Sequence, residues 1–85
     1  MIKTVFEFTE GVVRVSSHGF GSIRCIGRIG AAALNFVVHS DELWAAVFEV
    51  DESDPRSDDR WQHAKSVIYG LAMLQLEELR KEGIA

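Results

Sequence analysis

A single cysteine and a nearby histidine are the residues of this chain whose types could do chemistry together. Cys25 follows His18 by seven positions, in a chain of 85 residues that holds one cysteine and three histidines. A thiol beside an imidazole is the minimum for nucleophilic thiol catalysis, because the ring accepts the thiol proton and later returns it. The pair is the first candidate catalytic site, with Cys25 as nucleophile and His18 as base.

The spacing of the neighbouring residues predicts how the thiol would be activated. Apolar residues recur at spacings of three and four over residues 22–39, which predicts a helix with Ser22 as its N-cap. The predicted buried stripe of this helix is Ile23, Ile26, Ile29, Ala33, Phe36 and Val37. Cys25 would then lie in the first helical turn, where backbone N–H groups and the helix dipole stabilise a thiolate. Arg24 and Arg28 would add positive charge nearby. The sequence thus predicts a reactive thiol at the start of a helix.

A resemblance to a known family supports the same site. The chain opens with Met1-Ile-Lys, places Cys25 after His18 with six residues between them, and ends in a helix containing Gly70-Leu71-Ala72-Met73-Leu74. This layout resembles the ribosomal-processing cysteine protease (Prp) family. The resemblance implies one α+β domain over residues 1–85 that hydrolyses a peptide bond in the N-terminal extension of a ribosomal or phage structural protein. It also implies the residues that would contact the peptide and its oxyanion: Gly19, Phe20, Gly21 and Ser22.

The chain also departs from the pattern of that family, and the departures support an alternative. Family members have Gly-His-Ala around the histidine, where this chain has Ser17-His18-Gly19, and a serine at the position of Ile29. Aligned with family members that have a longer loop, Gly30 takes the place of the nucleophile. The alternative is a non-catalytic, dimeric protein-interaction module that retains the Prp-like fold. A third reading is an accessory protein that recruits a partner through the acidic loop at residues 51–59.

The order of elements predicts an α+β fold. Residues 2–8 and 12–17 alternate in polarity as two strands joined by a turn at Glu10-Gly11, which would pair Phe6 with Val15. The helix over 22–39 follows, and then a strand over residues 43–50. We therefore expect a β-hairpin, a helix, one or more further strands and a long C-terminal helix, with the helices packed on a small sheet.

The last helix predicts a homodimer. It follows an exposed loop over residues 51–59, begins at Ser57 or Asp58 and ends near Glu82, with Gly83 as its stop. About 25 residues make a helix of roughly 37 Å. Such a helix is longer than the core of so small a domain can cover, so we expect a second copy to bury the remainder.

Neither a metal nor a cofactor is predicted. His63 lies close to Trp61, Asp58 and Asp59, which is typical of a polar helix start with acids at the favourable end of the dipole. The acids of the loop at 51–59 do not follow the ligand order of a calcium loop. The glycines after His18 lack the Gly-Lys-Ser/Thr of a phosphate-binding loop.

Composition and charge limit the remaining classes of function. Hydrophobic residues make up 47% of the chain and charged residues 26%, which excludes a disordered chain. We expect no membrane span, and the single cysteine favours a reducing cytoplasm. The net charge of −4 argues against direct nucleic-acid binding. A protein or peptide substrate is what the family resemblance implies. The charge is uneven, with a net of +2 over residues 1–40 and −6 over residues 41–85.

Overall fold

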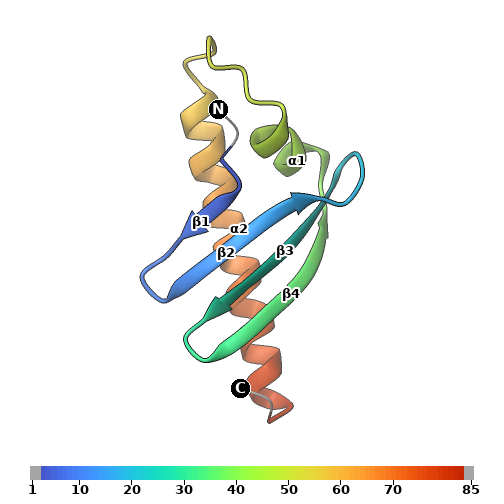
Figure 1. The fold of residues 1–85 in the computed structure, drawn as a ribbon, viewed down its shortest axis with the longest axis vertical. Coiled ribbons are helices and arrows are strands. Elements are labelled where there is room, and N and C mark those ends of the chain that lie inside the picture. The colour runs from blue at the N-terminus through green and yellow to red at the C-terminus, as the bar shows by residue number, and fades with distance from the viewer. Residues whose placement is uncertain (1–2, 84–85) are drawn as a thin grey trace.

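Four strands in sequence order form one antiparallel sheet, and the longest helix crosses one face of it (Figure 1). The computed structural model describes residues 3–83, so Ile2, the predicted start of the first strand, lies outside the described residues. The elements are β1 (Val5–Glu7), β2 (Gly11–Ser17), β3 (Ser22–Ile29), β4 (Ala32–His39), α1 (Asp41–Phe48) and α2 (Ser57–Lys81). The predicted α+β class, with helices packed on a small sheet, is confirmed.

The first hairpin is confirmed, with its turn one residue earlier than predicted. The backbones of Phe8 and Gly11 exchange hydrogen bonds of 2.8 and 3.3 Å and close the turn between them. Phe6 consequently pairs with Val13 and not with Val15. Because side chains alternate along a strand with a period of two, a shift of two residues leaves each one on its predicted face. Phe6 and Val13 accordingly both lie in the core.

The predicted helix over residues 22–39 is wrong, because this segment forms β3 and β4. Ile23 and Cys25 are buried at alternate positions of β3, whereas Ile26, which the helical spacing placed in the buried stripe, is 48% exposed on the other face. Gly30 has a φ of +59°, and the chain reverses there into β4. The apolar residues fit both periods, and the pairing of the two strands decides between them.

The close approach of β2 and β3 accounts for two glycines. A Cβ atom added to Gly27 would lie 2.2 Å from the carbonyl oxygen of Val12. A Cβ added to Gly11 would lie 1.9 Å from the carbonyl oxygen of Arg28. Both distances are far below van der Waals contact, so these two positions of the sheet admit glycine alone.

The predicted strand over residues 43–50 is also wrong, because α1 occupies most of it. Ser40 caps this helix, and its hydroxyl accepts a hydrogen bond of 3.2 Å from the backbone N–H of Leu43. Leu43, Ala46 and Val47 are buried at helical spacing. The range of the predicted strand, residues 43–50, contains no N-cap residue. The serine that caps the helix, Ser40, lies three residues before this range.

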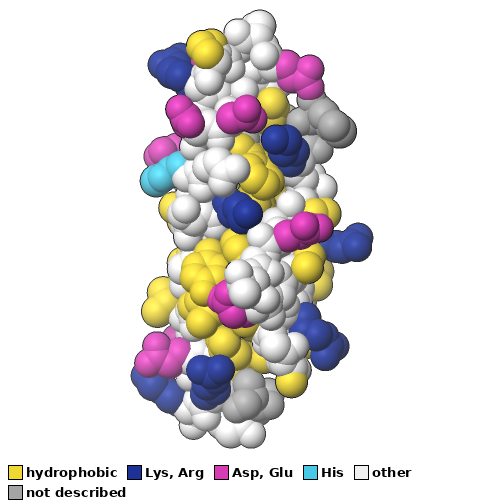
Figure 2. All heavy atoms as spheres, turned by 90° about the vertical axis from the view of Figure 1, so that its left-hand side faces the viewer, with side chains coloured by type: hydrophobic (Ala, Val, Ile, Leu, Met, Phe, Trp, Pro, Cys, Tyr) yellow, Lys and Arg dark blue, Asp and Glu magenta, His cyan; other side chains and the backbone are white. Residues whose placement is uncertain are grey.

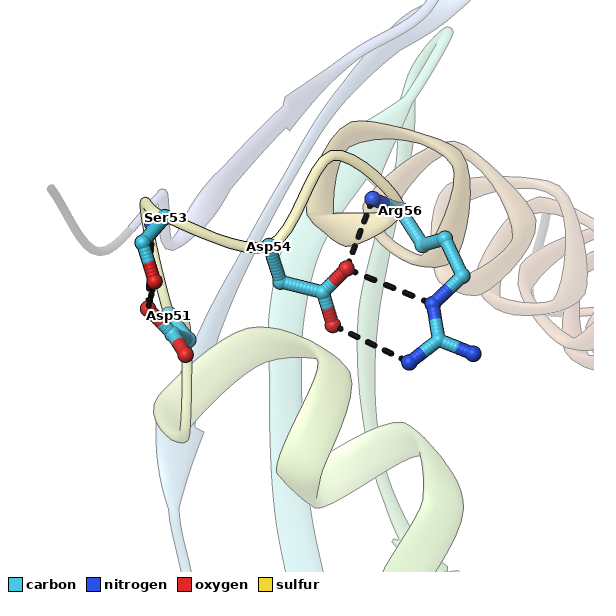
Figure 3. Close-up of polar contacts among 4 residues, drawn as sticks. All are labelled: Asp51, Ser53, Asp54 and Arg56. Carbon is cyan, nitrogen blue, oxygen red and sulfur yellow. Dashed lines mark hydrogen bonds and ion pairs between the residues drawn. The ribbon is translucent and has the colours of Figure 1, made fainter.

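The segment between α1 and α2 is the exposed loop that the sequence predicts, although α2 begins inside the predicted range. Ser53 donates two hydrogen bonds to Asp51, from its backbone N–H and its hydroxyl, at 3.0 and 2.6 Å. Asp54 accepts hydrogen bonds from the backbone and the guanidinium of Arg56 (Figure 3). These hydrogen bonds lower the pKa of both carboxyl groups. Asp51 and Asp54 are thus engaged within their own loop.

The long C-terminal helix is confirmed, and it provides one wall of the core. α2 ends at Lys81, and Gly83 follows with a φ of +75°. The buried side chains of α2 recur every four residues and pack with the sheet and α1 in one cluster: Ala64, Ile68, Ala72 and Leu76. A single chain therefore covers most of the apolar surface of α2, while Leu74 remains 60% exposed.

Side chains of α2 also satisfy the backbone at both edges of the sheet. At β4, the Gln75 amide donates to the carbonyl oxygen of Asn35 at 3.0 Å and accepts from its N–H at 3.2 Å. Next to β1, the indole N–H of Trp61 donates to the carbonyl oxygen of Lys3 at 3.1 Å, and its ring stacks on Phe6 with centroids 4.9 Å apart. Figure 2 shows the β1 side, where hydrophobic side chains lie among charged ones. The edges are therefore anchored to the helix that covers the sheet.

Substitution of Gly27 tests the close approach of β2 and β3. We expect Gly27→Ala to lower the free energy of unfolding by about 1–3 kcal/mol, because its methyl group overlaps the Val12 carbonyl oxygen. Chemical denaturation followed by circular dichroism measures the change. Ser16→Ala, at an exposed position of β2, is the control and should unfold like the wild type. Equal stability of all three proteins would contradict the packing described.

Candidate functional site

The predicted nucleophile lies in the core and not at the start of a helix. Cys25 is in the middle of β3, where it pairs with Val15 on one side and Phe36 on the other. Its side chain is fully buried, with an exposed fraction of 0%. Burial raises the pKa of the thiol to about 11. The activation predicted from a helix dipole is therefore wrong, and the thiol is protonated at neutral pH.

The structure does not bring His18 and Cys25 together. His18 is exposed just beyond the end of β2, and its backbone N–H donates to the carbonyl oxygen of Ser22 at 2.8 Å. Val15, the residue opposite Cys25, is three positions earlier, which corresponds to roughly 10 Å along a strand. One side chain is at the surface and the other faces the apolar core. The arrangement therefore lacks the contact between nucleophile and base that thiol catalysis needs.

The residues expected to contact a peptide form the turn between β2 and β3. Gly19 and Gly21 both have positive φ, of 104° and 75°, and hold Phe20 out of the core at 76% exposure. The ring of Phe20 lies against Trp44 of α1, with centroids 4.8 Å apart. The Trp44 indole donates to the hydroxyl of Ser17 at 2.9 Å. This turn presents an aromatic side chain to solvent, at some distance from the buried thiol.

Ser22 and His39 form a side-chain pair that the sequence did not predict. The Ser22 hydroxyl lies 2.8 Å from Nδ1 of His39, across the register of β3 and β4. A serine hydroxyl bonded to an imidazole is the minimum for a hydroxyl nucleophile. Catalysis of that kind also needs a group that orients the ring, and within residues 3–83 no carboxylate is hydrogen-bonded to His39. The pair therefore acts as a cross-strand contact.

The polar residues at the start of α2 form no metal site. His63 lines a cleft of about 420 Å³ between α1 and α2, whose apolar residues are Leu43 and Ala46. No group of three or more histidine, cysteine or acidic side chains is placed to hold a metal ion in the described part of the chain. Nor is any helix there long and apolar enough to cross a membrane.

The face of the sheet turned away from α2 is the surface that sequence reasoning missed. Side chains on this open face come from alternate positions of all four strands: Val5, Glu7, Val12, Arg14, Ser16, Ser22, Arg24, Ile26, Arg28, Ala33, Asn35, Val37 and His39. The predicted helix over residues 22–39 concealed this face, because it placed Ile26 inside the core. The alternation of Arg and Ile in β3 was the signal that could have identified it.

Aliphatic and basic side chains alternate in the centre of the open face. Val12 pairs with Arg28, and Arg14 pairs with Ile26, so each guanidinium group has an aliphatic neighbour across the strands. Val12 and Ile26 are 41% and 48% exposed. Paired side chains lie about 5 Å apart at Cβ and diagonal ones about 7–8 Å. We call Val12, Arg14, Ile26 and Arg28 the checkerboard.

The charges of the chain are divided between the two layers of the fold. Residues 1–40, which include all the strands described, carry a net charge of +2, and residues 41–85, which include both helices described, carry −6. On the open face, three arginines stand against the single acid Glu7. The uneven charge of the sequence therefore becomes a basic sheet surface on one side and an acidic helical surface on the other.

Comparisons of the chain with protein-family models, with curated proteins and with solved structures found no match.

The accessibility of Cys25 is testable with a thiol reagent. A rise in pKa from 9.0 to about 11 lowers the thiolate fraction near neutral pH about a hundredfold. We expect iodoacetamide to modify the native protein at least that much more slowly than the urea-unfolded protein, with a rate still rising above pH 9. His18→Ala should leave the rate unchanged. Fast alkylation near pH 7 that depends on His18 would restore the catalytic pair.

Proposed function

We propose that the chain is a non-catalytic protein-interaction module that binds an acidic, partly aliphatic segment of another protein on the open face of its sheet. The observation that carries this proposal is the checkerboard. Exposed aliphatic side chains and guanidinium groups lie side by side there, on a rigid surface of paired strands. Arginine is enriched among the residues that contribute most to the binding free energy of protein interfaces, and the buried centre of an interface is more apolar than its rim.

The guanidinium groups of the checkerboard are available to a partner. Arg24 lies beside the checkerboard, two residues before Ile26 in β3, and donates to the side-chain oxygen of Asn35 at 3.3 Å. For Arg14 and Arg28, no ion pair is found among residues 3–83. A guanidinium group binds a carboxylate through two parallel hydrogen bonds, which gives both charge and orientation. Asp or Glu side chains of a partner would therefore meet Arg14 and Arg28, while its aliphatic side chains would cover Val12 and Ile26.

The same surface argues against two other occupants. Nucleic-acid bases bind on sheets through aromatic stacking, and the described open face carries no aromatic ring besides the imidazole of His39. A second copy docked face to face would set three arginines against three arginines. An acidic protein segment meets neither objection.

The peptidase implied by the family resemblance has less support. It would require Cys25 to leave the core and His18 to move across the end of the sheet. The acidic loop at 51–59 is a weaker recruiting surface than the checkerboard, because Asp51 and Asp54 are already hydrogen-bonded within it. The interaction module needs no rearrangement of the fold.

Peptide binding tests the proposal. The probes are fluorescein-labelled peptides of alternating Glu and Leu, of Glu and Ser, and of Lys and Leu, together with single-stranded DNA, each followed by fluorescence polarisation. We expect the Glu-Leu peptide to bind most tightly and its affinity to fall with added salt. Arg14→Glu and Arg28→Glu should each weaken binding at least tenfold, since each sets a carboxylate against the acids of the peptide.

A matched charge reversal provides the control. Arg80→Glu makes the same substitution at an exposed position of α2, outside the open face, and should bind the Glu-Leu peptide like the wild type. Tighter binding of DNA, or equal losses in Arg80→Glu and Arg14→Glu, would refute the proposal.

A further inference from the structure

The exposed side of α2 carries an ordered set of residues that the core does not explain. The buried residues of α2 lie on one side of the helix: Ala64, Ile68, Ala72 and Leu76. An α-helix turns by 100° per residue, so the exposed residues on the opposite side of α2 lie within about 60° of one line drawn parallel to the helix axis. We call these exposed residues the outer stripe: Asp59, His63, Ser66, Gly70, Leu74, Glu77 and Lys81. Asp59 and His63 also line the cleft between α1 and α2.

The glycine at the centre of the outer stripe has no role within the single chain. Gly70 lies in the middle of a 25-residue helix, where glycine is less favourable than any other residue except proline. A Cβ atom added there would meet no other atom within 4 Å, in contrast to Gly27, whose neighbours leave no room. Leu74, one turn further along, is 60% exposed. Because glycine has no side chain, a second helix can approach closely at Gly70 and contact the exposed side chain of Leu74.

The charges of the outer stripe are arranged symmetrically about Gly70. If the α2 helices of two copies are antiparallel and related by a twofold axis at Gly70, a residue that lies before Gly70 in one copy faces the residue that lies equally far after Gly70 in the other copy. Asp59 is eleven positions before Gly70 and Lys81 eleven after, and His63 and Glu77 are seven before and seven after. Both pairs then join an acid to a basic side chain, and Glu77 and Lys81 of one helix also form an ion pair of 3.7 Å with each other. A parallel arrangement would instead set Asp59 against Asp59 and Lys81 against Lys81.

We propose that a second copy of the chain docks on the outer stripe, antiparallel and with the two helices crossing at Gly70. The stripe is self-complementary in charge, as an interface with twofold symmetry requires. Helices that cross at small residues approach to about 8 Å between axes. Because one helix of each copy makes most of the contact, the interface is smaller than the usual ~800 Å² per partner, and we expect a micromolar dissociation constant.

This dimer is independent of the proposed function and would extend it. The outer stripe faces away from the sheet, because the other side of α2 is buried against it. The open face is the side of the sheet turned away from α2, so the two surfaces lie on opposite sides of the molecule. Two copies would associate through their helices and present two open faces outward. A partner with two acidic segments would then bind more tightly than one with a single segment, because its second contact is intramolecular.

Sedimentation of the full chain over a range of micromolar concentrations tests the dimer. We expect a monomer–dimer equilibrium in the wild type. Leu74→Glu should weaken association at least tenfold, whereas Gln62→Glu, which adds the same charge to the side of α2, should leave it unchanged. Gly70→Leu should also weaken association, while the dilute monomer unfolds at the same or a higher temperature because leucine favours the helix. A chain that stays monomeric throughout, or a Leu74→Glu variant that associates like the wild type, overturns the proposal.

Charge reversal tests whether the two helices are antiparallel and whether the dimer interface lies on α2 or on the sheet. His63→Glu and Glu77→Lys should each weaken the dimer, and the double variant should restore it, since the two changes exchange the charges of one pair. Arg14→Glu should dimerise normally even if it loses peptide binding. Failure of the double variant to recover contradicts the antiparallel pairing, and loss of the dimer in Arg14→Glu would place the interface on the sheet instead.

Discussion

The packing of α2 across one face of the sheet is the constraint on which the rest of the structure depends. A four-stranded sheet with one apolar face is unstable until that face is covered, and here one helix covers most of it. Ile68 and Ala72 fill the centre, while Trp61 and Gln75 reach the two edges and satisfy backbone groups there. The helix is therefore both the second layer of the core and the support of the sheet edges.

That arrangement decides which surfaces remain free for function. Covering one face leaves the other exposed to solvent, and the alternation of side chains places Val12, Arg14, Ile26 and Arg28 there. The same alternation sends Cys25 inward, between Val15 and Phe36, where its thiol is shielded from solvent. The alternation that exposes the proposed binding surface is thus the one that buries the thiol.

Two glycines distinguish a contact within the chain from the contact proposed between two copies. Gly27 is explained within the chain, because β2 leaves no space for a side chain there. Gly70 has open space around it, so its reason must be sought outside the chain. A glycine is informative only when its surroundings are known. In the sequence the two look alike, since each interrupts an apolar segment.

The sequence by itself determined the elements whose signals are local. The alternating polarity of its residues predicts the first hairpin. Apolar residues at helical spacing over a long segment, followed by Gly83, predict α2. The division of charge into a basic first half and an acidic second half was also visible, and it became the two surfaces of the fold. These features survive because each depends on residues that are close together in the chain.

The tertiary structure alone decided the region from Ser22 to Phe48, and with it the candidate site. The apolar residues of 22–39 fit periods of both 3.6 and 2, and the pairing of β3 with β2 and β4 selects the second. A one-sided sheet, the burial of Cys25 and the open checkerboard all follow from that pairing. Strand pairing joins residues far apart in sequence, and its energy comes from packing and hydrogen bonds that no single segment contains. For this reason the predicted catalytic pair, which rested on a local helix, did not form.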